Sequence, residues 1–561
     1  MVRTSRARAP MYAIRGASRL LASGKTASEN GMRGRQGRVF EVGEQAGFMT
    51  GSRFTRRRFL KGLGAAFLTL ASTAGCEPLW GATRLVPVRT PRVAPLGAPK
   101  VWPLSGDSPT PPKSVWAFRS RPDLSPPAIE LIKKAHHTAP GYIFLAPEKG
   151  HTGQGGSLII DNEGQVVWFR PLRGTSGRTM NFEVQTYRGE PVLTWGETPG
   201  EYVIFDDSYH EIARFGAANG YSGDHHEFVI SPQNTALITI YDAVPKDLSS
   251  VGGSEDGSAV QGTVQEVDIE TGEVLFEWRS LDHVGLDETY GKPGEDVGHP
   301  SFDYFHINSI DVDHDDNLLI SARKTCAVYK IDRTTGEIVW RLGGKKSDFE
   351  MGPGARFAFQ HDARRLPDGT ISIFDNGPTV YRDGFPMVTE ESRAIILELD
   401  ERKMKASLVR EYTDGQHADA AGNTQALANG NVFVGWGRAL SISEFGHDGK
   451  PLFDARLQPG NRSYRAFRFP WSAQPPDRPA AAAERTSEAE VRVYASWNGA
   501  TGVERWEVLA GPRVESLKSL GAIARDGFET AMVVRTSAPY VAVRAKDRLG
   551  RTLGTAASVK V

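Results

Sequence analysis

Short apolar stretches separated by polar turns repeat along most of this chain. One recurring unit is an alternating strand, a turn usually rich in Asp or Gly, and a second strand with large apolar residues, which is the pattern of a β-hairpin. It occurs six times, in SLIIDNEGQVVWF (157–169), YVIFDDSYHEIARF (202–215), TVQEVDIETGEVLFEW (263–278), AVYKIDRTTGEIVWRL (327–342), AIILELDERKMKASLVREY (394–412) and SISEFGHDGKPLFDARL (441–457).

A second unit, a dense apolar strand, alternates with the first. It occurs as GYIFLAP (141–147), EPVLTWGE (190–197), TALITIYD (235–242), NLLISAR (317–323), TISIFDNG (370–377) and NVFVGWG (431–437). A pair of hairpins makes a four-stranded antiparallel sheet, which is too small to be stable unless it stacks on its neighbours. Six units of about 55 residues have the size of propeller blades. A β-helix has a shorter period and a sandwich has no reason to repeat, so the pattern predicts an all-β fold with a six-bladed β-propeller over residues 140–470.

The segments around the repeats have a different composition. Residues 77–139 are rich in Pro, Arg and Ser and predict a tether with one short amphipathic helix near residues 127–137. Residues 471–490 are rich in Pro and Ala and predict a linker. Residues 491–561 alternate again, with Trp497 and Trp506 as large apolar anchors, and predict a small Ig-like or fibronectin-like sandwich that serves as a binding or spacing module.

The N-terminal segment carries the features of an export signal. Residues 1–75 contain 14 Lys and Arg against 3 Asp and Glu, whereas the whole chain balances 67 against 67. Arg56 and Arg57 stand in TRRRFLK, before an uncharged stretch that is too short to span a bilayer. This pattern resembles a twin-arginine (Tat) signal. It predicts export to the periplasm or the outer face of the cytoplasmic membrane, with Met49 as an alternative start.

The leader ends in TAGC at Cys76, which resembles a lipoprotein cleavage box. Acylation of Cys76, cleavage after a small residue and an uncleaved anchor all stay open, so we expect membrane contact only through the signal or a lipid. The second cysteine, Cys326, precedes a strand and is expected to be a small core residue. Two cysteines exclude a disulfide scaffold and a cysteine-based zinc cluster. The acidic body gives no support for nucleic-acid binding.

Polar residues recur at one position of the repeats, at the start of the strand that would line the propeller axis. Three of the 13 histidines fall in this column. Ligand sites of such folds form where this column converges. Its members are Asn181, His226, His306, His361 and Asn423.

Arginines border the same region, namely Arg323, Arg382 and Arg393. The planar guanidinium group suits a tetrahedral oxyanion, although a salt bridge is the alternative for each of them. Histidines with arginine and few paired carboxylates disfavour glycoside hydrolysis, and no G-x-S-x-G nucleophile motif occurs. A metal site of three histidines stays open.

Several motifs resemble the bacterial arylsulfotransferase (aryl-sulfate sulfotransferase-like) family over roughly residues 115–470. They are FHINSI, NLLISAR, VYKIDRTTGEIVWRLGGKKSDF, QHDARRLPDGTISIFDNG, SRAIILELD and NTQALANGNVFVGWG. The resemblance implies a six-bladed propeller that moves a sulfuryl group from an aryl sulfate to a phenol. It also implies a ping-pong mechanism through a sulfo-histidine, with no nucleotide donor such as PAPS, no metal and no other cofactor.

Carried over residue by residue, the resemblance implies that His306 and His361 are catalytic, with Arg382 the nearest match to the family's arginine. His226 completes the expected catalytic set. The expected substrate-binding residues are Arg323, Arg393, Asn181, Asn423 and Asn308. The family's nucleophile is a histidine of a late blade, where the column of this chain has Asn423, so the identity of the nucleophile is left open.

Two other functions compete with sulfuryl transfer. One is a non-catalytic binding or adhesion protein of the cell envelope, which the missing late-blade histidine favours. The other is a quinoprotein-like dehydrogenase, because TGE-x-x-W turns also occur in such propellers, although these usually have eight blades. The sequence names neither the phenolic donor and acceptor nor the partner of the C-terminal module.

Overall fold

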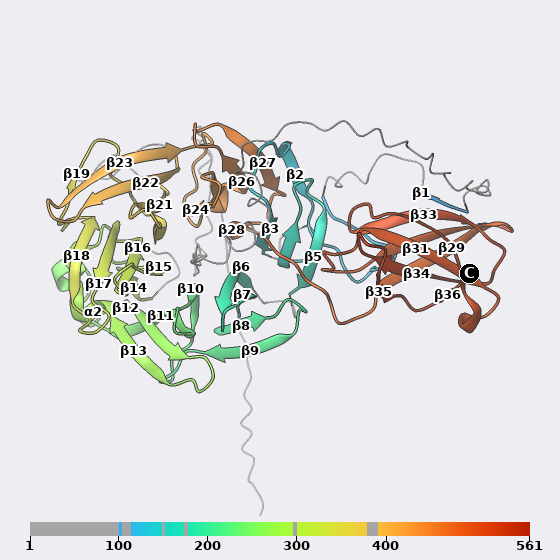
Figure 1. Ribbon diagram of the computed structural model, residues 1–561. Helices are drawn as coiled ribbons and strands as arrows, with labels where there is room; N and C mark the ends of the chain where they lie inside the picture. The colour runs from blue at the N-terminus through green and yellow to red at the C-terminus, as the bar shows by residue number, and fades with distance from the viewer. Residues whose placement is uncertain (1–99, 104–113, 149–151, 173–177, 296–299, 378–390) are drawn as a thin grey trace, which may run out of the picture. The chain divides into compact units, whose positions relative to one another are not determined.

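The computed structural model describes residues 100–103, 114–148, 152–172, 178–295, 300–377 and 391–561 (Figure 1). The predicted export signal, with Arg56, Arg57 and Cys76, lies outside these residues. Within them, regular structure is almost entirely β, with one four-residue α-helix, α2 (Ser280–His283), and a few 3-10 turns. None of the described helices is long and apolar enough to cross a membrane. The prediction of an all-β fold is confirmed for these residues.

Six antiparallel sheets of four main strands follow one another along the described chain. In pairing order, the first sheet is β28 (Ser463–Phe469), β3 (Tyr142–Pro147), β4 (Gly156–Ile160) and β5 (Val166–Pro171), and the second is β6 (Thr179–Tyr187), β7 (Glu190–Glu197), β8 (Glu201–Phe205) and β9 (Glu211–Gly216). The third sheet is β10 (Asp224–Ile230), β11 (Thr235–Pro245), β12 (Ser258–Asp268) and β13 (Val274–Arg279), and the fourth is β15 (Ile307–Val312), β16 (Leu318–Ala322), β17 (Ala327–Ile331) and β18 (Ile338–Gly343). The fifth sheet is β20 (His361–Arg365), β21 (Ile371–Asp375), β22 (Arg393–Asp400) and β23 (Lys405–Tyr412), and the sixth is β24 (Asn423–Ala426), β25 (Val432–Gly435), β26 (Ser441–Phe445) and β27 (Pro451–Leu457).

The first strand of each sheet, called here an inner strand, lies at a common centre, and Figure 1 shows the outer strands arranged around it. β6 contacts β10 and β28, β10 contacts β15, β15 contacts β20, β20 contacts β24, and β24 contacts β28, so the inner strands form a closed cycle. The cycle is closed by β28, which comes late in the chain but pairs with β3 at the start of the repeats. The result is a β-propeller-like ring.

The apolar core lies between neighbouring sheets. Each sheet presents alternate side chains to the sheet on either side, and the largest of these, such as Trp195, Trp278 and Trp436, are fully buried. One cluster joins the third and fourth sheets through residues such as Val264 and Ile320. Cys326 is buried as predicted, while His314 stands in an exposed turn.

The short helix predicted near residues 127–137 is not formed. Residues Ile129–Lys133 are instead a strand, β2, which pairs with β27 as a fifth strand at the outer edge of the last sheet. The unpaired edge of β27 offers backbone hydrogen bonds that a five-residue amphipathic segment can satisfy better as a strand than as an isolated helical turn. The same kind of outer addition occurs at β19 (Glu350–Met351), which pairs with β23.

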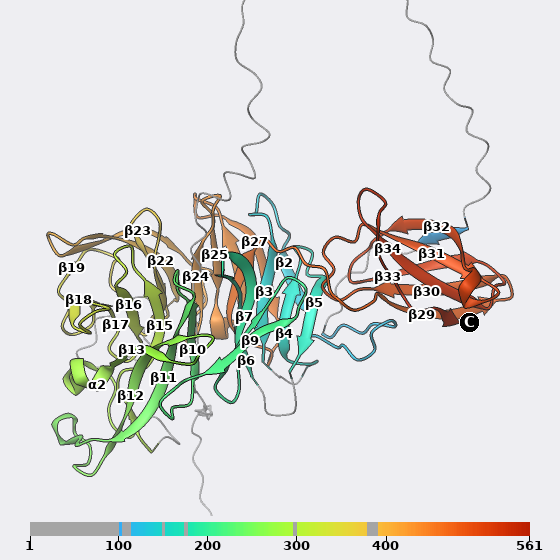
Figure 2. The same ribbon diagram turned by 60° about the horizontal axis from the view of Figure 1, so that its bottom comes forward.

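The C-terminal residues form a separate two-sheet unit (Figure 2). One sheet has the order β1 (Val101–Pro103), β33 (Glu529–Arg535), β30 (Glu490–Ser496), β29 (Ala480–Ser487). The other has β32 (Lys518–Ala524), β31 (Arg505–Gly511), β34 (Tyr540–Lys546), β35 (Thr552–Thr555), with β36 (Val559–Lys560) beside β34. Trp497 and Trp506 are buried in its core, as predicted.

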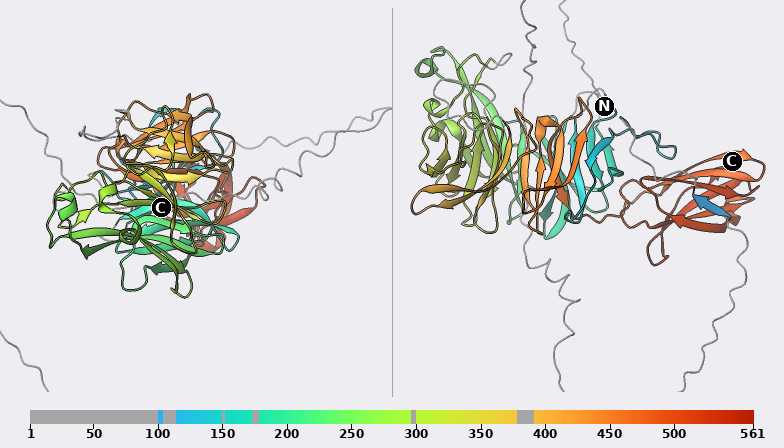
Figure 3. Two further views of the ribbon diagram at one scale, coloured as in Figure 1. Left: turned by 90° about the vertical axis from the view of Figure 1, so that its left-hand side faces the viewer. Right: turned by 90° about the horizontal axis from the view of Figure 1, so that it is seen from above.

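Two parts of this unit come from segments predicted to be unstructured. Residues 480–487 of the expected linker form β29, and Val101–Pro103 of the expected tether form β1, which pairs with β33. Figure 3 shows β1, in blue, among the strands of the C-terminal unit. The guanidinium of Arg535 lies 4.9 Å from the ring centre of Trp102 and covers this added strand. Both segments are edge strands of this sheet. The partner of β1, β33, lies far away in sequence, whereas β29 forms a hairpin with β30, which follows it directly.

The C-terminal unit contacts β5, the outer strand of the first sheet, through the side chain of Asn498, which hydrogen-bonds the β5 backbone as a neighbouring strand would. The amide of Asn498 accepts a hydrogen bond from the Phe169 N–H and donates one to the Phe169 carbonyl, both at 2.9 Å. The next residue, Gly499, has a φ of 93°, and a Cβ there would lie 2.4 Å from the ring of Tyr209, so only glycine fits.

Replacing Asn498 by alanine is expected to lower the free energy of unfolding by about 1–3 kcal/mol, because the backbone groups of Phe169 lose their partners. Urea denaturation measures this loss. The control is Gln233→Ala in an exposed turn, which should leave the midpoint unchanged. Equal stability of the two variants would show that this contact does not stabilise the chain.

Candidate active site

Irregularities in the inner strands aim polar side chains at the centre of the ring. Pairing shifts between Asp224 and Phe228 in β10, between Ile307 and Ser309 in β15, and between His361 and Arg364 in β20. Such bulges bend a strand and redirect its side chains. His306 and Asp362 also have positive φ values, of 54° and 58°, which non-glycine residues adopt rarely.

The three histidines of the predicted column come together. The ring centres of His226 and His306 are 4.9 Å apart, with the rings nearly perpendicular. Tyr464 of β28 lies near both His226 and His361, with its ring centre 6.4 Å from that of His226 and 5.8 Å from that of His361. Side chains from four different sheets therefore meet at one place near the axis.

His306 is held by a carboxylate and stays partly open to solvent. Its Nδ1 bonds to Oδ2 of Asp303, and the two side chains are 12% and 15% exposed. Asp303 belongs to β14 (Phe302–Asp303), which pairs with β12 and so fixes the position of the carboxylate. Burial raises the pKa of Asp303, but the adjacent His306, through its charge and its hydrogen bond, outweighs burial and lowers the pKa overall.

His226 is more deeply enclosed. Its Nδ1 lies 2.6 Å from Oδ1 of Asp224, and Nε2 lies 3.4 Å from the hydroxyl of Tyr241, which stacks on the imidazole. Burial, with the nearby charges of His306, His361 and Arg465, holds the pKa of His226 well below its usual value. Burial likewise raises the pKa of Asp224 well above its usual value. This imidazole is therefore neutral near pH 7.

His361 has both ring nitrogens engaged by the protein. Asn376 donates its two amide hydrogens to the carbonyls of Ala418 and Ala421, so its Oδ1 accepts a hydrogen bond from Nδ1 of His361 at 2.6 Å. Nε2 accepts the N–H of Ala421 at 3.3 Å. Burial, and next the charge of Arg323, hold the pKa of His361 well below its usual value.

The three predicted arginines differ in their surroundings. Arg323 lies near the histidines, donates to the carbonyl of Asp419 at 2.9 Å and stacks on Phe359, while its buried Nε–H has no partner among the described residues. Arg382 lies outside the described residues.

Arg393 does not face the cluster. It bonds Asp375 and Glu411 and the carbonyls of Gly354 and Arg356 with all five of its N–H groups. The salt bridge that was the alternative reading is what the structure has, because the buried carboxylate of Asp375 lies directly across the strand pair.

The predicted asparagines also differ in whether their side chains are fully hydrogen-bonded by the protein. Asn423 bonds both the N–H and the carbonyl of Ala466, so its amide joins β24 to β28 and is not available to a ligand. Asn308 donates to the carbonyl of Gln360, and Asn181 is buried in β6. The Oδ1 atoms of Asn308 and Asn181 have no hydrogen-bond partner among the described residues. An unpaired buried acceptor costs about 1–3 kcal/mol, so these two favour a polar ligand or water nearby.

A network of charges lies next to the histidines, along the inner strands. The guanidinium of Arg364 bonds Asp362 at 3.0 Å and lies 3.4 Å from Glu227. Arg465, fully buried, lies 3.5 Å from Asp362 and donates to the carbonyl of Asn308. The network joins four inner strands and places a fixed positive charge beside the histidine cluster.

Residues 183–458 match the model of the family described as Arylsulfotransferase (ASST). This match supports the family that the sequence motifs predicted. The arylsulfotransferase match begins in β6 and ends just after β27, so it includes His226, His306 and His361.

Other comparisons add little to the arylsulfotransferase match. No curated protein matches the chain. Among solved structures, a protein of unknown function from Bacteroides caccae is 14% identical, with 58% of this chain and 98% of that chain covered and a TM-score of 0.36. A virginiamycin B lyase from Staphylococcus aureus is 9% identical, with 72% and 98% covered and a TM-score of 0.30. At these scores neither likeness carries an argument about function.

Several residues of the site were not predicted from the arylsulfotransferase motifs. Asp224 and Asp303 had a signal in the sequence, since each stands two or three positions before a column histidine. Tyr241 lies in the neighbouring strand β11, and Tyr464 and Arg465 lie in β28, which the repeat pattern left out. The described residues contain no group of three or more His, Cys, Asp or Glu placed to hold a metal ion.

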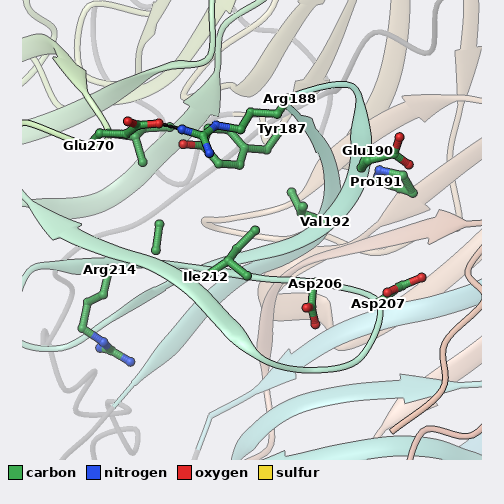
Figure 4. A pocket seen from close by; sticks show the side chains of 12 residues that line it. Tyr187, Arg188, Glu190, Pro191, Val192, Asp206, Asp207, Ile212, Arg214 and Glu270 are labelled. Atoms are coloured by element: carbon green, nitrogen blue, oxygen red, sulfur yellow. Dashed lines mark ion pairs between the residues drawn. The ribbon is translucent and has the colours of Figure 1, made fainter. Parts of the chain in front are cut away.

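A surface pocket elsewhere on the second sheet has a different character (Figure 4). It is lined by the β6–β7 and β8–β9 turns together with Ile269 and Glu270. Arg188 pairs with Glu270 across it, and Val192 and Ile212 form an apolar part of its wall. No histidine lines this pocket, so it shares no residue with the cluster.

Proposed function

We propose that this chain is an exported arylsulfotransferase-like enzyme that transfers a sulfuryl group from an aryl sulfate to a phenol through a histidine-based ping-pong mechanism. The observation that carries the proposal is the meeting of His226, His306 and His361 within the region that matches the arylsulfotransferase family. The match by itself indicates a sulfotransferase-type enzyme. The specific reaction, the mechanism and the export are our proposal.

The groups at the cluster suit sulfuryl chemistry. Buried neutral imidazoles can attack or accept protons near pH 7. The unpartnered Nε–H of Arg323 can bind a sulfuryl oxygen, and the buried positive charge of Arg465 favours an anionic substrate in the same place. Phe359 and Tyr241 place aromatic rings beside Arg323 and His226, a setting that suits an aryl group.

The other parts of the chain are interpreted in agreement with this proposed function. We infer that the six sheets are the six blades of a propeller over residues 140–470, and that the C-terminal unit is an Ig-like module that has taken up β1. The twin-arginine signal supports a place in the periplasm or on the outer face of the cytoplasmic membrane, with or without a lipid at Cys76.

One observation favours the non-catalytic alternative. The column position of the last sheet is occupied by Asn423, whose amide is bonded to the backbone of Ala466. A binding protein that kept the fold needs no late-blade histidine.

Purified protein is expected to release 4-nitrophenol from 4-nitrophenyl sulfate continuously only when a phenol is added, with the sulfated phenol as product. The Arg323→Met variant should lower kcat by about 100-fold, the usual effect of removing one donor to a developing oxyanion. Arg402→Met, in an exposed turn, is the matched control and should be unaffected. Folded protein that turns over no aryl sulfate with any phenol would favour the binding alternative.

A further inference from the structure

We propose that Nε2 of His306 is the atom that accepts the sulfuryl group, and that Asp303 is the residue that positions it. This inference rests on the proposed function and names the nucleophile, which the missing late-blade histidine leaves open. It follows from the different surroundings of three imidazoles that lie within one cluster.

Only one of the three histidines combines an open nitrogen with access from solvent. Both ring nitrogens of His361 are bonded, and the residue is 1% exposed. The side chain of His226 is 2% exposed, with Asp224 on one side and Tyr241 on the other. The side chain of His306 is 12% exposed, and its Nε2 has no hydrogen-bond partner among the described residues.

The backbone of His306 is fixed in an unusual conformation. Its φ of 54° lies in the left-handed region, and its carbonyl accepts the N–H of Arg323 at 2.9 Å. The carbonyl of the following residue, Ile307, accepts the hydroxyl of Tyr241. Strain of this kind persists only where the surroundings over-determine it, which preorganises the imidazole for attack.

The Asp303 bond selects the tautomer that a nucleophile needs. A carboxylate only accepts, so Nδ1 of His306 carries the proton and the lone pair lies on Nε2. The same contact stabilises the positive charge that the imidazole gains on attack. Asp303 therefore has the orienting role that a carboxylate has toward a catalytic histidine in other enzymes.

The step is balanced in atoms and electrons. The Nε2 lone pair forms the N–S bond as the S–O bond to the aryl group breaks, and the phenolate leaves with that electron pair. The product is a positively charged sulfo-imidazole whose Nδ1–H faces Asp303. An acceptor phenol then loses its proton to bulk water, its oxygen attacks sulfur, and the N–S electron pair returns to Nε2.

The direct experiment is to trap the intermediate on the full chain. The protein is mixed with 4-nitrophenyl sulfate without a phenol, quenched in base, digested and analysed by mass spectrometry. We expect a burst of 4-nitrophenolate equal to the enzyme and one sulfuryl group on His306, which disappears when phenol is added. A sulfuryl group on His226, His361 or another residue overturns the assignment and leaves the proposed function in place. If the protein is not labelled and does not turn over the aryl sulfate, both the assignment of His306 and the proposed function are overturned.

The His306→Ala variant should form no labelled peptide and show no burst, with turnover lowered by at least about 1,000-fold. Added imidazole, which fits the space left by the ring, should restore part of the 4-nitrophenolate release. The rescue and the trapping of the unmodified chain keep the test valid even if the variant is less stable. A burst of unchanged size in His306→Ala would overturn the assignment.

Asp303→Asn tests the positioning role separately. We expect kcat to fall by about 10–100-fold with KM unchanged, and the pH profile of kcat to shift, because the amide no longer stabilises the charged imidazole. Asp282→Asn, an exposed carboxylate in α2, is the matched control. An unchanged kcat and pH profile, with only a lower melting temperature, would mean that Asp303 is merely structural.

Discussion

The Arg364→Met variant is expected to lose about 3–5 kcal/mol of unfolding free energy, the usual cost of removing one partner from a buried ion pair. Arg364 is 5% exposed and donates to Asp362 and to the Ile310 carbonyl, while Glu227 lies within 3.4 Å. Its removal leaves Asp362 and Glu227 without this positive charge and removes its own links from β20 to β10 and β15. Guanidinium denaturation at neutral pH measures the loss.

Two further variants test this explanation. Arg364→Lys keeps the charge but not the planar donor geometry, so it should lose an intermediate amount. Arg402→Met removes an exposed arginine and should leave the unfolding midpoint unchanged. A loss below about 1 kcal/mol for Arg364→Met, the range of surface pairs, would contradict a stabilising role of the inner-strand network.

His361→Ala is expected to lower the free energy of unfolding by about 2–4 kcal/mol, because the Ala421 N–H and the Asn376 carbonyl oxygen are left buried without partners. His361→Gln offers one donor and one acceptor of similar reach, so it should lose much less. Thermal and urea unfolding of the two variants measure the difference.

A comparison of the unmodified protein with His361→Gln is also expected to show a pH dependence of stability. Burial, the charge of Arg323 and, more weakly, the charges of Arg465 and His306 hold the pKa of His361 well below the 6.5 of an exposed histidine. As the pH falls below 6.5, the unfolded chain takes up a proton at this position and the folded chain does not. The unmodified protein should therefore lose about 1.4 kcal/mol per pH unit relative to His361→Gln between about pH 6 and 5.

The exposed His314 provides the control for both measurements. His314→Ala should change neither the stability nor its slope with pH. Parallel stability curves for the unmodified protein and His361→Gln would mean that His361 becomes protonated in the folded state, against the burial seen here.

Much of the fold could be predicted from local sequence alone. Alternating apolar stretches and Gly or Asp turns specify hairpins through contacts between neighbouring residues, so most strands of the six sheets were expected where they occur. Edge strands were not, because their partners are remote. β1 pairs with β33, β2 with β27 and β28 with β3. From sequence alone, β1 was interpreted as part of a tether and β2 as part of a helix, and β28 was not recognised as a strand.

The sequence by itself determined that the chain is built from repeated β-hairpins and that three histidines share one position at the start of the inner strands. Periodicity and strand position decide these features, and both are local properties. Only the tertiary structure decided what each polar group does. Arg393 meets Asp375, Asn423 meets the backbone of Ala466, and His361 is held between Asn376 and Ala421, whereas His306 keeps an open nitrogen. The role of a buried polar side chain depends on which atoms satisfy its hydrogen bonds, and those atoms come from sheets far away in the sequence.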